Sequence, residues 1–314
     1  MRLLRVFSNE PHFRFMRWRR WAMACALAVV LGTAGLLATV GLNLGLDFAG
    51  GVLIEARSDK PVDLAGLRAL IGGKMTHGVS LQTFGAPNDV LIRVQAPDGG
   101  TANLERTVAQ VSALLQPGYE IRRSEYLGPQ VSSELLHKSI VAAVLAVVLI
   151  GIYVWFRFEW QFGLCAVLTT FHDVIAIVGL IALLRLEFSL PLVAALLTIA
   201  GYSINDTVVV FDRIRENMRL HKRMALPELI DRSVNQTLSR TVLTSGTTLL
   251  AVLPLLIFGG PILRDFALAI TWGILVGTVS SVYVAAPLLL LLTPHHGALE
   301  RSTTPGGGAE PAAG

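Results

Sequence analysis

Two carboxylates stand inside long apolar stretches of this 314-residue chain. Asp173 lies near the middle of residues 162–184, and Asp206 lies in the second half of residues 190–211. An ionised residue at the centre of a membrane helix costs about 2.5 to 3.5 kcal/mol on insertion scales, so it is a functional hypothesis by default. A carboxyl group that alternates between charged and neutral forms can carry a proton. We therefore take Asp206 and Asp173 as candidate proton-coupling residues, with a buried carboxylate that only locks helices together as the alternative.

Arg240 opens the apolar stretch 239–258, on the same predicted side of the membrane as Asp206. We expect an ion pair between the two if their helices pack side by side. The alternative is an arginine that extends to the membrane interface and pairs with nothing. Hydroxyl side chains at helical spacing accompany both residues and are candidates to relay protons. These relay residues are Ser203, Thr207, Thr241, Thr244 and Thr248.

The composition predicts that these stretches are membrane helices. The chain is 53% hydrophobic and 15% charged, whereas a soluble domain carries about a quarter charged residues. About 20 apolar residues in a helix cross a bilayer, and lipid offers the backbone no other hydrogen-bond partner. The predicted fold class is an α-helical membrane protein with six transmembrane helices and one small α+β domain. The predicted spans are 21–42, 137–156, 162–184, 190–211, 239–258 and 264–292.

Basic residues set the predicted orientation through their bias toward the cytoplasmic side. Four arginines fall within residues 14–20, just before the first span, and further basic residues crowd residues 212–238. Both termini are therefore expected in the cytoplasm, with the chain in a bacterial inner membrane. Apolar residues at helical spacing within 212–238 predict a separate amphipathic helix on the inner membrane surface. Residues 293–314 are rich in Gly, Pro and Ala and are expected to be disordered.

The region between the first two spans, residues 43–136, contains no apolar stretch long enough to span and should form the exported domain. Its pattern predicts strands at 52–56, 79–84, 90–94 and 119–126, with helices at 63–71 and 104–115 and a turn at 85–89. This order is that of a ferredoxin-like domain. The domain shows no catalytic constellation, which favours a binding or mechanical role.

The cysteines, the net charge and a repeat of small residues restrict the range of functions further. The cysteines, Cys25 and Cys165, have no metal-ligand spacing, so no metal site is expected. The net charge of +4 lies beside apolar blocks, which argues against a nucleic-acid partner. Gly273 and Gly277 belong to a four-residue repeat of small residues in the sixth span, which favours close helix packing.

With these residues in view, the chain resembles the SecF branch of the SecD/SecF protein-export family, within the resistance-nodulation-division group. The motifs that carry the resemblance span nearly the whole chain, and 201–216 (GYSINDTVVVFDRIRE) is the most specific. Two departures, Val52 and Leu127, involve no charge. The other matching segments are 45–51 (GLDFAGG), 127–129 (LGP), 153–160 (YVWFRFEW) and 172–173 (HD).

The resemblance implies a subunit that works with SecD and the SecYEG channel, with YajC as a further candidate partner. Unfolded pre-proteins would be the substrates and protons the coupling ion, with no cofactor and no enzymatic activity. The residues that this family links to proton passage match Asp206 and Arg240, and SecD would supply six further spans. In addition, we infer a hinge at Asp47, Gly50 and Gly51, for which a tight turn without motion is the alternative.

Three other functions stay open. A passive scaffold for SecD would need no titrating residue. A proton-driven small-molecule efflux subunit would be expected to have larger exported domains and twelve spans in one chain. An intramembrane protease would use Asp173 and Asp206 as paired carboxylates, but no Gly-x-Gly-Asp run surrounds either residue.

Overall fold

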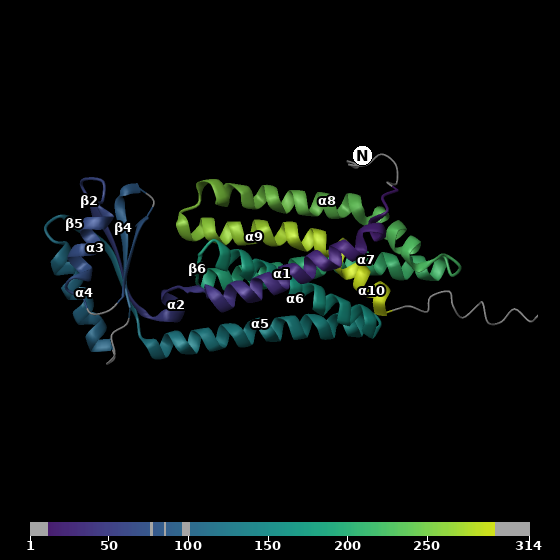
Figure 1. Cartoon of the computed structure of the whole chain (residues 1–314), viewed down its shortest axis with the longest axis horizontal. Coiled ribbons are helices and arrows are strands. Elements are labelled where there is room, and N and C mark those ends of the chain that lie inside the picture. Colours follow the sequence, from purple (N-terminus) through teal and green to yellow (C-terminus); the bar gives the residue numbers. More distant parts are fainter. Residues whose placement is uncertain (1–11, 76–77, 85, 96–100, 293–314) are drawn as a thin grey trace, which may run out of the picture.

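The computed structural model describes residues 12–75, 78–84, 86–95 and 101–292. A long helical bundle carries a small sheet domain at one end (Figure 1). In the described residues, six helical stretches are long and apolar enough to cross a membrane, with mean hydropathy between 1.6 and 2.6. The fold is therefore a six-span α-helical bundle with one α+β domain between the first two spans, as the sequence predicted. The predicted tail 293–314 and most of the basic N-terminus lie outside the described residues.

The bundle is built from long helices that run nearly parallel to one another (Figure 1). Proline stands in the first turn of α5, α7, α8 and α9, where its missing N–H costs no helical hydrogen bond. The helices are η1 (Phe15–Trp18), α1 (Arg19–Thr39), α5 (Pro129–Arg157), α6 (Trp160–Leu183), α7 (Leu190–Leu220), α8 (Leu226–Phe258), α9 (Pro261–Ser280), η2 (Ser281–Ala285) and α10 (Ala286–Leu292).

The sheet domain is ferredoxin-like. Its strands are ordered β3-β4-β2-β5, and the neighbouring strands are antiparallel. Asp63 caps the first helix by accepting hydrogen bonds from the backbone N–H groups of Ala65 and Gly66, at 3.0 and 3.1 Å. The elements are β2 (Gly51–Ser58), α3 (Leu64–Gly72), β3 (Val79–Phe84), β4 (Ala86–Val94), α4 (Thr101–Leu115) and β5 (Tyr119–Leu127).

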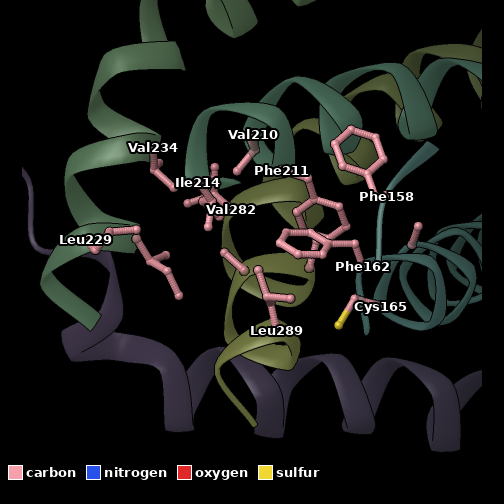
Figure 2. Close-up of a cluster of buried hydrophobic side chains, with 14 of the residues drawn as sticks. Phe158, Phe162, Cys165, Val210, Phe211, Ile214, Leu229, Val234, Val282 and Leu289 are labelled. Atoms are coloured by element: carbon pink, nitrogen blue, oxygen red, sulfur yellow. The ribbon is translucent and has the colours of Figure 1, made fainter. Parts of the chain in front are cut away.

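The prediction of a separate amphipathic helix in 212–238 is wrong. This region consists of the last turns of α7, a short turn and the first third of α8, which continues without a break into the fifth span. Leu229 and Val234 of α8 pack toward Ile214 of α7 and Val282 of η2 (Figure 2). The apolar face of this segment is thus buried against neighbouring helices of the bundle.

Smaller differences lie where the sheet domain joins the bundle. The predicted turn at 85–89 is mostly strand: β4 begins at Ala86. The register of its pairing with β3 shifts between Thr83 and Phe84. Helix α5 begins at Pro129, inside the predicted exported domain, so the second span is longer than the apolar stretch that revealed it. Three short elements were not predicted: β1 (Asn43–Leu44), α2 (Leu46–Ala49) and β6 (Glu187–Phe188).

Helix α9 approaches α7 closely at two glycines. A Cβ added to Gly273 would come within 2.6 Å of Ile199, and one added to Gly277 would come within 3.2 Å of Ser203. Both contacts are tighter than ordinary van der Waals packing, so a larger residue would push these helices apart.

We predict that Gly273→Ala lowers the free energy of unfolding by about 1 to 3 kcal/mol, because the new methyl group has no room beside Ile199. Gly246 in α8 is the matched control, since a Cβ there meets no atom within 4 Å. Gly246→Ala should stabilise the protein by about 1 kcal/mol through helix propensity. Thermal unfolding of the purified variants in detergent measures both effects, and equal shifts would contradict the proposed close approach.

Candidate site of two buried carboxylates

Asp173 is a fully buried carboxylate in the middle of the bundle. Its Oδ2 accepts a hydrogen bond from Ser280 Oγ at 2.7 Å and another from Ser203 Oγ. Its Oδ1 lies 2.9 Å from Nδ1 of His172, which donates this hydrogen bond when the carboxylate is ionised. The donors come from α6, α7 and the end of α9, so this one carboxylate ties three membrane helices together.

This arrangement satisfies the physical requirement of a buried charge. An ionised carboxylate away from water is tolerated only when hydrogen-bond donors replace its hydration. Ser203 was predicted to serve Asp206, one helical turn further along α7, but its hydroxyl is bonded to Asp173. Ser280 and His172 were not among the predicted site residues. The adjacency of His172 to Asp173 was visible in the sequence, whereas Ser280 is 107 residues away.

Asp206 is the second buried carboxylate, only 3% exposed, and it is partnered differently. Its Oδ2 has no hydrogen-bond partner, and neither has the buried hydroxyl of Thr241 in α8. Thr207, its neighbour in α7, is buried as well. Asp206 therefore retains an acceptor that nothing in the described part of the chain satisfies.

Arg240 does not form the expected ion pair with Asp206. Among the described residues, no nitrogen of Arg240 lies within 4.0 Å of a carboxylate oxygen. Its side chain is exposed at the surface of α8, although its charge is close enough to act on Asp206. The two helices do pack side by side, as the hypothesis required. The position of Arg240 around the α8 axis directs it outward.

The predicted hydroxyl relay is only partly assembled. The Thr244 hydroxyl donates to the backbone carbonyls of Arg240 and Thr241, at 3.0 Å each, and Thr248 donates to the carbonyl of Thr244 at 2.8 Å. These bonds run within α8 and do not link the two carboxylates, although the Thr244 hydroxyl is also close enough to act on Asp206.

A separate hydroxyl cluster, which was not predicted, joins three helices. Ser245 Oγ of α8 lies 2.6 Å from Thr278 Oγ1 of α9 and accepts a hydrogen bond from Tyr202 OH of α7 at 3.2 Å. Ser245 lies four residues after Thr241, which was the available sequence signal.

The predicted hinge residues lie where the bundle meets the sheet domain. Asp47 belongs to α2, and its Oδ2 accepts a hydrogen bond from the backbone N–H of Leu190 at 2.8 Å. Gly50 and Gly51 have φ values of +68° and +124°, which L-residues with a side chain rarely adopt. A Cβ on Gly50 would also meet the Leu127 carbonyl oxygen at 3.1 Å.

No group of three or more His, Cys, Asp or Glu side chains in the described ranges could hold a metal ion. Both cysteines are free, with Cys25 exposed and Cys165 buried in the bundle. The chemistry of this site is therefore that of carboxyl, hydroxyl, imidazole and guanidinium groups.

The fold and these residues define the class: a multi-pass membrane protein with one ferredoxin-like domain and buried carboxylates in its bundle. Residues 107–295 match the model of the C-terminal region of the protein export membrane proteins SecD and SecF, and residues 35–62 match the SecD/SecF GG motif. The chain belongs to the SecD/SecF family, in its SecF branch.

Its relatives include the protein translocase subunits SecF of Magnetococcus marinus and Rhodobacter capsulatus. The first is 45% identical, over 93% of this chain and 95% of the relative. The second is 41% identical, over 92% and 91%.

Among solved structures, the chain resembles SecDF of Thermus thermophilus, a translocon-associated membrane protein, with a TM-score of 0.81 and 39% identity over 92% of this chain. A SecDF structure in a super-membrane-facing form matches with a TM-score of 0.70, 39% identity and 95% coverage. The chain spans only 40% and 41% of these two SecDF chains.

We predict that Ser280→Ala lowers the free energy of unfolding by about 1.5 to 3 kcal/mol, because a buried carboxylate loses a donor. Ser281→Ala is the matched control, since this equally buried hydroxyl donates only to the Thr278 carbonyl, at 2.9 Å. It should cost about 0.5 to 1.5 kcal/mol. Chemical denaturation in detergent compares the two variants, and a smaller loss for Ser280→Ala would show that Asp173 does not depend on this hydroxyl.

Proposed function

We propose that this chain uses the proton-motive force, together with SecD, to promote the passage of pre-proteins across the inner membrane. The observation that carries the proposal is the contrast between its buried carboxylates. Asp173 is satisfied by donors from three helices, whereas Asp206 has an oxygen without a partner beside α8. A carboxylate that lacks donors has the most to gain from binding a proton.

Protonation of Asp206 would change the attraction between α7 and α8. When Asp206 is ionised, the charge of Arg240 attracts it across the helix interface. When Asp206 is neutral, this attraction is lost and the helices can shift relative to each other. A proton that crosses a 100 mV potential releases about 2.3 kcal/mol, which is comparable to a typical coupling energy between two conformations. Asp173, being fully bonded, would hold α7 in place during the cycle or accept a proton in turn.

Exposed polar residues on α8 favour a partner that covers this helix within the membrane. Arg240 and Thr247 are exposed there, beside Thr244 on the same stripe of the helix. Ionisable residues in membrane helices face a bundle interior or a water-filled cavity, and this surface is open in the single chain. The SecDF chains that it resembles are more than twice as long. We infer that SecD supplies the missing half and covers this stripe.

The remaining partners and the location follow from the family and the charge pattern. The SecYEG channel would deliver unfolded pre-proteins to the sheet domain on the outer side, and YajC is a further candidate partner. The arginines of residues 12–20 and the basic end of α7 lie at the end of the bundle opposite the sheet domain (Figure 1). With the positive side inward, both termini would be cytoplasmic.

We predict that Asp206→Asn abolishes the stimulation of export by a proton gradient, because an amide of the same shape cannot titrate. Asp212→Asn is the matched control: it removes a carboxylate from the same helix, at a side chain that is 61% exposed. Translocation of a pre-protein into inverted membrane vesicles, with and without a gradient, measures both variants. If Asp206→Asn keeps normal stimulation, the chain acts as a passive scaffold for SecD.

We predict that Thr247→Trp reduces co-purification of SecD from gently solubilised membranes, because a bulky ring would separate the covered helices. Leu145→Trp serves as control, at an equally outward position on α5 that carries no polar stripe. Undiminished recovery of SecD with Thr247→Trp would place the contact elsewhere on the bundle.

A further inference from the structure

Helix α7, which carries both Ser203 and Asp206, is capped by a residue from a distant segment. Its own N-cap residue, Ser189, makes no side-chain capping hydrogen bond. The first backbone N–H of the helix, that of Leu190, donates to Asp47 Oδ2 at 2.8 Å across 143 residues of sequence. Asp47 lies in α2, in the segment that connects α1 to the sheet domain. The start of α7 is therefore bonded directly to the connector of the sheet domain.

The connector is held against the loop before α7 by further contacts. Strand β1 pairs in parallel with β6, and Gly45 N–H donates to the Phe188 carbonyl at 2.8 Å. The rings of Phe48 and Phe188 pack with their centroids 5.4 Å apart. A Cβ on Gly45 would come within 3.0 Å of the Phe188 carbonyl oxygen, so this approach is close. The segment before Gly50 is thus attached closely to the loop that leads into α7.

The sheet domain reaches the same loop from its other side. Arg93 of β4 forms an ion pair with Glu187 of β6, immediately before the start of α7. Beyond Asp47, the chain passes through Gly50 and Gly51, both at positive φ, and enters β2. The loop of residues 184–189 therefore contacts both the connector and the sheet domain, and β6 lies near α2 at the end of the bundle that faces this domain (Figure 1).

A displacement at the start of α7 acts on the proton site because both lie on one unbroken helix. Asp206 is 16 residues after Leu190, about 24 Å along the axis. Packed helices shift as rigid elements, so a push at one end appears at the other. In its middle, α7 contacts α8 where Tyr202 OH donates to Ser245, and it contacts α9 where Gly277 approaches Ser203.

We propose that Asp47 is a positioning residue that links the sheet domain to α7, so that movement of the domain about Gly50 and Gly51 shifts Asp206 against α8. The inference rests on the proposed function, since it names the connection through which proton binding at Asp206 reaches the sheet domain. In this view the sheet domain turns at Gly50 and Gly51, and Asp47 passes the displacement of the connector to the first turn of α7.

The test distinguishes a mechanical link through Asp47 from a cap that only stabilises α7. Asp47→Ala removes the acceptor and should lower both the thermal midpoint and the stimulation of export by a proton gradient. Adding Ser189→Asp supplies α7 with a carboxylate cap of its own, within reach of the Leu192 N–H. We expect Asp47→Ala/Ser189→Asp to recover the thermal midpoint but not the gradient stimulation. Asp59→Ala, at an exposed bend of the sheet domain, is the matched control and should change neither.

The outcomes distinguish a failure of the proposed link from a failure of the proposed function. If the double variant regains gradient stimulation together with its midpoint, Asp47 only caps α7 and the link is wrong. If Asp47→Ala alone leaves stimulation intact, the contact has no role in coupling. If Asp206→Asn in the same vesicles keeps its stimulation, the proposed function itself fails. The double variant is informative even where Asp47→Ala alone is too unstable to purify, because its own cap supports the helix.

Discussion

The whole arrangement depends on how an apolar bundle accommodates carboxylates. Burial removes water from the charge, so each oxygen must find donors within the protein or remain costly. Asp173 obtains its donors from Ser203, Ser280 and His172, and in doing so joins three helices. Asp206 lies one turn beyond Ser203 and has an unsatisfied oxygen. The same chemical group is thus fully bonded at one position and keeps an oxygen without a partner at the other.

Helix α7 is the element on which the other features converge. Its start is bonded to the connector of the sheet domain through Asp47, and its middle is tied to α6 and α9 through Ser203. Its later part carries Asp206 toward α8. A single rigid helix therefore touches every part of the molecule that the proposed cycle would have to coordinate.

Helix α8 exposes polar side chains on the outside of the bundle, where contact with lipid would be unfavourable. Arg240 and Thr247 are exposed on α8, while the outward faces of α1 and α5 are apolar, as lipid contact requires. This chain spans 40% and 41% of the SecDF chains of similar structure.

Local patterns were enough to predict the six spans and the ferredoxin-like domain, because apolar length, strand alternation and helix spacing do not depend on which elements pack together. They also identified Asp173 and Asp206, since a carboxylate in an apolar run is conspicuous. Four features became known from the packed structure alone: Ser203 bonds to Asp173, Arg240 points outward, α8 is continuous from Leu226, and Asp47 caps α7. These features depend on rotation about helix axes and on contacts across more than a hundred residues, which local patterns do not encode.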